Sequence, residues 1–385
     1  MRARLFLTVL GFVLLVAPAL RAQAPANDDA IRLLAELSNA PAPSGFEGAV
    51  RQILRREFLA NGLDVSTDGL GSIIGVLRGS SATPRIMLAA HMDEVGAVVR
   101  YITPQGMVKF QLLGGWLDQA LVDQRWTILT AKGPVLAISG LISPHIIAPA
   151  DRTRVFPRDE VFLDVGASSR AQAEALGIRP GDGIAPATAF QPLAYGRYTG
   201  KALDDRIGCV AMIETLRRLR AAHITLPNTV YFVGTVQEEI GARGAQTAAA
   251  IVKPDVGISL ESGIASDHPG GRLDATQERL GAGPTIYLAD AGMLINLKLR
   301  DFLIGIATAN HIPFQTEVTT GGFEDSEQLQ RFDGGRPAVN LAVAARYLHN
   351  HNSEIDRSDL ERTIDLLVKT LPQLDAAAVS RLSRF

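Results

Sequence analysis

Three strand-like segments, the first of them an apolar run without polar alternation, limit this chain's fold more than any other feature. They run from Arg85 to Ala90, from Thr229 to Thr235 and from Val256 to Glu261. Segments with helical apolar spacing alternate with the later ones, at Ile207–Leu219 and Ala242–Val252. A strand that is apolar on both faces suits a sheet covered by helices on both sides. The alternation therefore predicts an α/β sheet layered with helices.

Further segments extend this pattern toward both ends of the chain. Helices are expected at Ile31–Asn39, Phe46–Ala60, Leu294–Asn310 and Ser358–Leu371, and strands at Ser72–Leu77 and Pro337–Val343. The middle differs, because from Thr103 to Pro192 short β-rich runs such as Gln124–Leu129 and Val135–Leu141 are broken by Gly and Pro, with one short helix at Ala171–Leu176. We therefore expect a small β domain at 103–192, inserted between α/β segments 27–102 and 193–385.

Composition narrows the function classes. Of 385 residues, 47% are hydrophobic and 20% are charged, which is ordinary for a globular protein and excludes wholesale disorder and a polytopic membrane protein. The formal net charge of -2 offers no electrostatic footprint for nucleic acid. Cys209 is the single cysteine, so neither an intrachain disulfide nor a Cys-based zinc site can form. A bound metal must have His and carboxylate ligands.

The N-terminus has the pattern of a secretory signal peptide. Arg2 and Arg4 precede an apolar run over Leu5–Leu20, and small residues follow, so cleavage is expected after Ala22 or Ala26. A membrane anchor is the alternative, but the run is shorter than the roughly 20 residues that a span needs. We therefore predict a signal peptide at 1–26, a secreted or periplasmic mature protein, and no stable membrane anchor after cleavage.

Metal-capable side chains gather at five places, most of them directly after a predicted strand. They are His91 with Asp93, Asp204 with Asp205, Glu238 with Glu239, Glu261, and His349 with His351. In open α/β sheets, ligands bind outside the carboxyl ends of the strands, so these side chains are expected to meet. Taken singly, each place has an ordinary alternative as a helix cap, a surface carboxylate or a polar loop.

Within these places, neighbouring groups suit a division of labour. The carboxylate of Asp93 could accept the second ring N–H of His91 and so fix its tautomer. Of the adjacent aspartates, one could bridge two cations while the other pairs with Arg206. Of the paired glutamates, one can bind metal while its neighbour moves a proton. Together the clusters supply the ligands of a co-catalytic hydrolase site, namely His91, Asp204, Glu239, Glu261 and His349.

The chain resembles the tetrahedral aminopeptidases, which are glutamyl-aminopeptidase-like co-catalytic zinc metallopeptidases. The resemblance extends from about Leu33 to Leu371. It rests on the motifs Ala89–Asp93, Gly200–Arg206, Val236–Gly241, Arg243–Ala245 and Arg346–His349, with Leu113–Trp116 in the inserted domain. It implies a three-layer αβα catalytic domain with an inserted, small β-barrel-like dimerisation domain. It also implies removal of N-terminal residues from peptides, and assembly of dimers into hollow dodecamers.

The resemblance implies a ligand set as well. One metal ion would be held by His91, Asp204 and Glu261, and the other by Asp204, Glu239 and His349, so that Asp204 bridges them. The ions would be two divalent cations per subunit, zinc with cobalt as a substitute.

Two further residues receive roles from the resemblance. Glu238 would be the general base that deprotonates a metal-bridging water, and Asp93 would orient His91. The family is largely cytoplasmic, in contrast to the export signal expected here.

The sequence departs from the family pattern at three points. Glu261 stands where Asp is usual, and Gly322–Asp325 reads Gly-Phe-Glu-Asp where Gly-Gly-Thr-Asp is frequent. His349 and His351 both could supply the last ligand, with His349 favoured by its spacing from Tyr347. Two other functions stay open. They are an N-acyl amino acid deacylase or carboxypeptidase using the same metals, and a non-catalytic metal- or peptide-binding protein.

Overall fold

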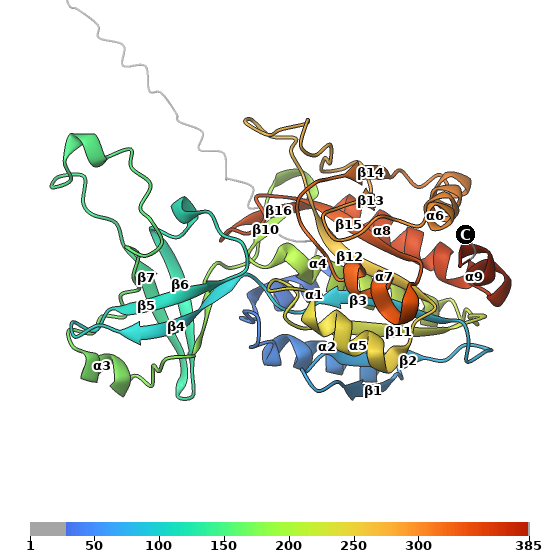
Figure 1. Cartoon of the computed structure of the whole chain (residues 1–385), viewed down its shortest axis with the longest axis horizontal. Coiled ribbons are helices and arrows are strands. Elements are labelled where there is room, and N and C mark those ends of the chain that lie inside the picture. The colour runs from blue at the N-terminus through green and yellow to red at the C-terminus, as the bar shows by residue number, and fades with distance from the viewer. Residues whose placement is uncertain (1–27, 384–385) are drawn as a thin grey trace, which may run out of the picture.

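The computed structural model describes residues 28–383, and the predicted signal peptide at 1–26 lies outside this range. An eleven-stranded mixed sheet forms the larger part (Figure 1). Its main path follows the order β1 (Asp64–Thr67), β2 (Ile73–Leu77), β11 (Thr229–Thr235), β3 (Arg85–His91), β12 (Val256–Ile264), β15 (Ala338–Arg346), β16 (Ser353–Asp356), β10 (Arg197–Gly200) and β9 (Gln191–Pro192). Off this path, β13 (Thr285–Ala289) pairs with β15 and with β14 (Gln315–Val318). The predicted α/β fold is confirmed.

Helices cover both faces of this sheet. On one face, α1 (Asp29–Asn39), α2 (Gly48–Ala60), α4 (Leu203–Ala221), α6 (Leu297–Ala309) and α8 (Arg357–Thr370) contribute to one large core. On the other face, α5 (Arg243–Val252) and α7 (Ser326–Arg331) pack on a second, smaller core. The short α9 (Ala376–Leu382) closes the chain beside α6. Because helices lie on both sides, the central strands are buried nearly throughout, as the unbroken apolar run at Arg85–Ala90 predicted for its own strand.

The four central strands run parallel and place their carboxyl ends at one edge. Strand β3 pairs in parallel with β11 on one side and β12 on the other, and β12 pairs in parallel with β15. The register sets Thr235 level with His91 and Ser259 level with Ala89. Glu261 therefore reaches the same height as His91, and residues after Thr235 lie just beyond that edge.

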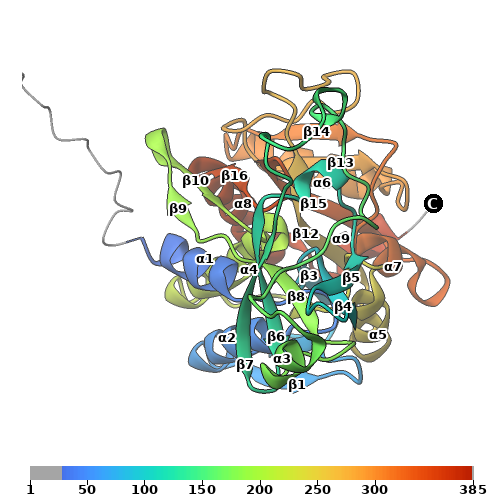
Figure 2. The same ribbon diagram turned by 90° about the vertical axis from the view of Figure 1, so that its left-hand side faces the viewer.

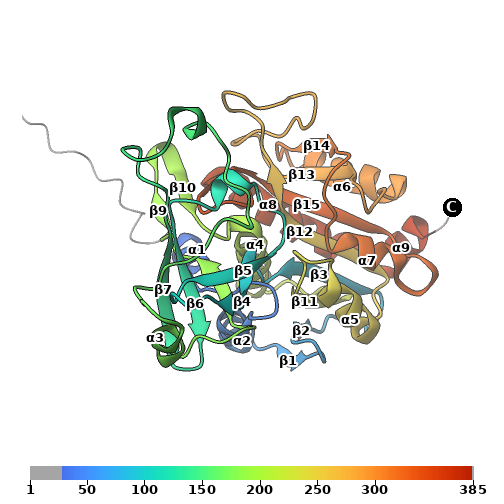
Figure 3. The same ribbon diagram turned by 60° about the vertical axis from the view of Figure 1, so that its left-hand side comes forward.

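A second sheet stands to one side of the α/β body (Figures 1 and 3). Its antiparallel strands follow the order β5 (Val108–Leu113), β4 (Gly96–Ile102), β8 (Gly183–Pro186), β6 (Gln124–Thr130) and β7 (Gly133–Ser139). Figure 2 looks from this side and shows the small sheet in front of the larger one. It has its own core, centred on Trp126, with α3 (Arg170–Ala175) nearby. Strand β4 begins at Gly96, ahead of the expected start at residue 103.

The edges of this small sheet come together without forming a closed ring of strands. Within residues 28–383, the named strands form an open path from β5 to β7. Isolated bridges join Leu163 to Val108 of β5 and Asp164 to Ile138 of β7. The closed, barrel-like form that we expected is therefore only approximated, because two residues of an irregular segment take the place of a sixth strand.

Candidate metal and active site

Five elements bring the predicted ligands to the carboxyl edge of the central strands. His91 ends β3, and Glu261 lies in β12. Asp204 is in the first turn of α4, Glu239 follows β11, and His349 lies in the loop between β15 and β16. Residues separated by up to 258 positions thus meet at one place, as the shared position of their motifs after strands predicted.

The carboxylate of Asp204 lies between the two histidines. Its Oδ1 is 3.3 Å from His91 Nε2, and its Oδ2 is 3.3 Å from His349 Nε2. Glu239 Oε2 is 3.4 Å from His349 Nε2, and Glu261 Oε2 is 3.8 Å from His91 Nε2. Asp204 therefore lies near both histidines, while Glu261 lies near His91 and Glu239 lies near His349.

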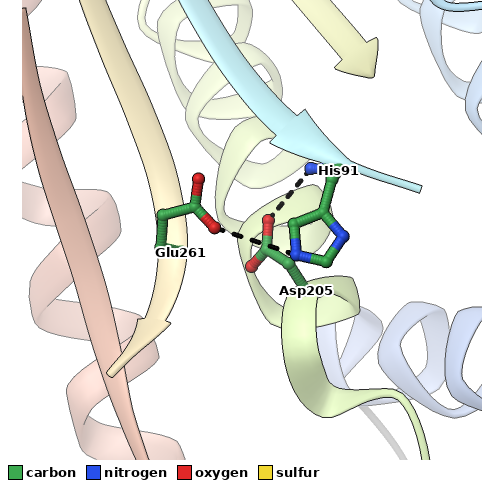
Figure 4. Close-up of side chains that lie close together, drawn as sticks. All are labelled: His91, Asp205 and Glu261. Atoms are coloured by element: carbon green, nitrogen blue, oxygen red, sulfur yellow. Dashed lines mark hydrogen bonds and ion pairs between the residues drawn. The ribbon is translucent and has the colours of Figure 1, made fainter. Parts of the chain in front are cut away.

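Two groups of side chains place one ligand atom each within 4.8 Å of the others. One group is Asp204, Glu239 and His349, and the second is His91, Asp205 and Glu261 (Figure 4). Asp205 in the second group accepts the backbone N–H of His91 at 3.2 Å and that of Gly208 at 2.9 Å. Its carboxylate is therefore committed to holding the start of α4 against the end of β3.

The arginine beside these aspartates does not pair with Asp205, contrary to the interpretation from sequence. Arg206 is fully buried and donates from Nη1 to the carbonyl of Leu37 at 3.0 Å. Its Nη2 lies 3.6 Å from Glu94 Oε1, and Lys201 Nζ donates to the same carboxylate at 2.7 Å. Glu94 thus neutralises two buried cations behind the site, which the sequence analysis did not recognise.

Asp93 holds the end of β3 to the loop that follows β11. It is fully buried and accepts hydrogen bonds from Ser44 Oγ at 2.6 Å and from the backbone N–H groups of Glu238 and Glu239 at 3.0 and 3.2 Å. His91 Nδ1 hydrogen-bonds the backbone carbonyl of Asp93 at 3.2 Å, and Asp93 Oδ1 lies 3.6 Å from the same nitrogen. Burial raises the pKa of Asp93, but its contacts with His91 and Ser44 outweigh that effect and lower it. The hydrogen bond that fixes the ring of His91 therefore goes to the backbone of Asp93, with the Asp93 carboxylate close beside it.

The electrostatics of the two histidines follow from the surrounding acids. Burial opposes the charged form of His91, yet its contacts with Asp204 and Asp93 raise its pKa well above 6.5. Burial likewise lowers the pKa of His349, but Glu239 and Asp204 raise it to about 9. Without an ion, each imidazolium therefore neutralises part of the acidic cluster.

Glu238 lies beside this cluster and makes few hydrogen bonds of its own. Its Oε2 is 3.9 Å from His91 Nε2, and its buried Oε1 has no hydrogen-bond partner. Burial raises its pKa well above 4.5; the charge of His91 opposes this shift, and the charges of Glu261 and Glu239 add to it. A buried carboxylate with a raised pKa and a free oxygen is suited to accepting and returning a proton.

The unpaired oxygens of the cluster test whether metal ions fit here. The buried Glu238 Oε1, Glu239 Oε1 and Glu261 Oε2 have no hydrogen-bond partner. A buried carboxylate oxygen without a partner is costly, and a divalent cation removes that cost. Imidazole and carboxylate ligands in this number suit zinc and related divalent metals. The residues present therefore fit the ions that the sequence predicted.

His351 lies outside the cluster. Its ring packs edge-on against Trp126 with centroids 4.4 Å apart, and against Trp116 at 5.6 Å. Both ring nitrogens lack a hydrogen-bond partner, and burial together with the charge of Lys201 lowers its pKa to about 4. The structure therefore brings His349, and not His351, to the acidic side chains.

A pocket of about 540 Å³ opens over the cluster. Asp204, Glu238, Glu239 and His349 line its inner end. Its remaining wall comes from the end of β12, from the segments after β12, β14 and β15, and from Gly115 after β5, and it includes Glu324. Glu324 was noted in the sequence only as a departure from the family pattern, because its position depends on a loop that no local pattern predicts.

The α/β fold and the cluster of His and carboxylate side chains at its strand ends define a metal-dependent hydrolase. Residues 71–366 match the family described as M42 glutamyl aminopeptidase, and the chain belongs to this family. It is an aminopeptidase, and M42 peptidases are metal-dependent. The predicted family and enzyme class are thus confirmed.

Curated relatives and solved structures agree with this assignment. The chain is 35% identical to lysyl aminopeptidase of Pyrococcus furiosus, over 89% of this chain and 96% of the relative. It is 32% identical to glutamyl aminopeptidase of Lactococcus lactis, over 93% and 99%. The TET aminopeptidase of a Thaumarchaeota archaeon superimposes with a TM-score of 0.89 at 37% identity, covering 92% of this chain and 100% of that one.

The comparisons also correct the predicted location. The TET- and FrvX-type aminopeptidases that match this chain are cytosolic proteins, so the prediction of a secreted or periplasmic protein is wrong. That prediction rested on residues 1–26, which lie outside the described residues. Within 28–383, no helix combines the length and the apolar character that a membrane span requires.

Proposed function

We propose that this aminopeptidase removes N-terminal residues from peptides with two divalent ions, zinc with cobalt as a substitute. The observation that carries the proposal is the placement of Asp204, whose two carboxylate oxygens each lie 3.3 Å from a different histidine. His91 and Glu261 would complete the ligand set of one ion, and Glu239 and His349 that of the other. Asp205, although near His91, is occupied by two backbone N–H groups.

The side chains around the two proposed metal ions have separate roles in the proposed reaction. When bound, the ions would polarise the scissile carbonyl and lower the pKa of a water, so that it can lose a proton and attack that carbonyl. Glu238 takes the proton of the attacking water and later gives it to the leaving amine. Asp93 holds the ring of His91 in place, and the carbonyl of Gly115 accepts the Nδ1–H of His349 at 2.9 Å.

The test is hydrolysis of aminoacyl anilides by the purified chain before and after chelation, with zinc or cobalt added back. We expect activity to disappear on chelation and to return with metal, at two ions per chain by elemental analysis. Asp204→Asn should lower the content of both ions, whereas Glu327→Gln, whose carboxylate pairs with Arg331 outside the pocket, should not. Full activity after complete chelation would contradict the proposal.

We also propose that the inserted domain joins copies of this chain. In two solved structures that resemble this chain, PhTET1 forms a dodecamer, and the Pyrococcus horikoshii TET1 peptidase can assemble into a tetrahedron or a large octahedral shell. Large apolar side chains are exposed on the inserted domain, among them Ile146 at 80%, Leu136 at 62% and Leu117 at 60%. A concentration of exposed apolar area is typical of a protein interface.

Light scattering on the full chain tests this assembly. We expect a dimer or a larger multiple, and Ile146→Asp should shift the mass toward the monomer. Leu59→Asp serves as the matched control, because Leu59 is exposed on α2 of the α/β body. A monomeric wild-type chain would overturn the proposal.

A further inference from the structure

Resting on the proposed aminopeptidase function, we infer that the pocket selects peptides whose N-terminal side chain is apolar. The side chains that would contact it are Ile264, Phe323 and Tyr347. All three line the same pocket as Asp204 and Glu238. A substrate whose first carbonyl lies at the acidic cluster therefore places its first side chain against this wall.

The apolar wall is assembled from three separate parts of the chain. Ile264 ends β12 three residues after Glu261, Phe323 lies in the loop between β14 and α7, and Tyr347 follows β15 two residues before His349. Each remains substantially exposed, at 46%, 40% and 46% respectively. Large apolar side chains that stay exposed around one cavity are typical of a binding site for an apolar group.

The ring of Tyr347 has a neighbour that supports it in this position. The imidazole of His268 lies 5.2 Å from it between centroids, at an interplanar angle of 48°. His268 lines the pocket as well. The wall therefore has a partly fixed shape before substrate binds, which reduces the entropy lost on binding.

Charge in the pocket disfavours an acidic first residue. The acidic side chains that line it are Asp204, Glu238, Glu239 and Glu324, and among these lining residues there is no Lys or Arg. A substrate carboxylate at the apolar wall would lose water without gaining a lysine or arginine as partner.

A cationic first residue has no counter-ion at the wall either. Glu324 is the one lining acid outside the proposed metal and proton-transfer residues. Its carboxyl shares a side-chain hydrogen bond with Glu261 and lies near Glu238 and Asp204. Those neighbours place the carboxyl at the metal end of the pocket, so it is turned toward the cluster and not toward a side chain lying on Ile264 and Tyr347.

A panel of leucyl, phenylalanyl, methionyl, glutamyl and lysyl anilides tests the inference on the metal-loaded enzyme. We expect kcat/KM for the apolar residues to exceed that for Glu and Lys by at least about tenfold, within the discrimination that one side-chain pocket achieves. A preference for Glu or Lys would overturn the inference while leaving the aminopeptidase function intact. No hydrolysis of any member would instead overturn the proposed function.

A charge introduced into the wall separates pocket selection from other causes. Phe323→Lys should lower kcat/KM for the leucyl substrate and raise it for the glutamyl substrate, changing their ratio by at least about tenfold. Leu273→Lys is the matched control, because Leu273 is 47% exposed and does not line the pocket. A ratio that Phe323→Lys leaves unchanged, in a protein of unaltered melting temperature, would contradict the inference.

Discussion

Glu238 combines burial, an unpaired oxygen and closeness to His91, which are the properties of a proton-transfer residue. We predict that Glu238→Gln lowers kcat by at least about 100-fold, because an amide cannot accept the water proton. Both metal ions should remain, since Glu238 is not among the proposed ligands. Elemental analysis with steady-state kinetics checks this, and Glu327→Gln is the control. Wild-type turnover by metal-loaded Glu238→Gln would remove the role.

A second acidic side chain, Glu278, links burial to the pH dependence of stability. Burial raises its pKa to about 7; the charge of Glu317 adds to this, while hydrogen bonds from Tyr287 and Thr285 oppose it. The carboxyl of Glu278 binds its proton more tightly in the native state than in the unfolded state. The free energy of unfolding therefore falls as pH rises from about 4.5 to 7. Above that range the loss is complete.

Replacing Glu278 should therefore change stability in a pH-dependent way. We predict that Glu278→Gln is more stable than the wild type at pH 8, by at most about 3 kcal/mol, and gains nothing at pH 4.5. Urea unfolding at both pH values measures the difference. The exposed Glu160→Gln should show no such trend. An equal effect of Glu278→Gln at both pH values would refute the assignment.

At the scale of elements, the loop between β15 and β16 connects the two sheets. His349 donates to the carbonyl of Gly115 at 2.9 Å, and His351, two residues later, packs on Trp116 and Trp126 of the small sheet. The inserted domain therefore holds a proposed metal ligand in place, although it supplies none itself. Outer contacts of this kind commonly change metal affinity 10- to 100-fold.

Loss of this packing should weaken metal binding without removing a ligand. We predict that His351→Ala raises the dissociation constant of the more weakly held ion by about tenfold or more, whereas His351→Phe, which keeps the ring, has a smaller effect. Competition with a chelating dye provides the measurement, and the exposed His145→Ala is the control. Unchanged affinity in His351→Ala would show that the contact does not position His349.

The elements that the sequence predicted well are those whose environment is uniform. The strand at Thr229–Thr235 has the predicted bounds, because it is covered on both faces along its whole length. Strand β12 runs three residues beyond its predicted end at Glu261, because pairing with β15 continues to Ile264. Strand β4 was missed, since its burial alternates irregularly; it forms a hairpin with β5 and also pairs with the distant β8.

Some residues of the candidate site could likewise be placed from the sequence, and others could not. The residues His91, Glu239 and Glu261 could be placed from sequence, because each lies at or just after a central strand. The position of Asp205 against the backbone of His91 could not, because it depends on the local backbone at the start of α4. The pocket wall depends on loops that meet only in the folded chain.

At the scale of the whole molecule, metal binding and folding should be coupled. The proposed ligands come from β3, β12, the start of α4 and two loops. Two metal ions bound by these ligands would therefore tie together segments from most of the chain. An ion that binds the native state alone stabilises it by about 2.7 kcal/mol at 100 times its dissociation constant. Removing the ions also leaves the buried carboxylates of Glu239 and Glu261 without compensation.

We therefore predict that chelation lowers the melting temperature by several degrees, at about 1 °C for each kcal/mol lost in a chain of 385 residues. Zinc added back should restore it. The shift should vanish in Asp204→Asn, which lacks the shared carboxylate, and persist in Glu238→Gln, which keeps every proposed ligand. Differential scanning fluorimetry of the three proteins, with and without chelator, separates these cases. A shift of full size in Asp204→Asn would show that the stabilising ions bind elsewhere.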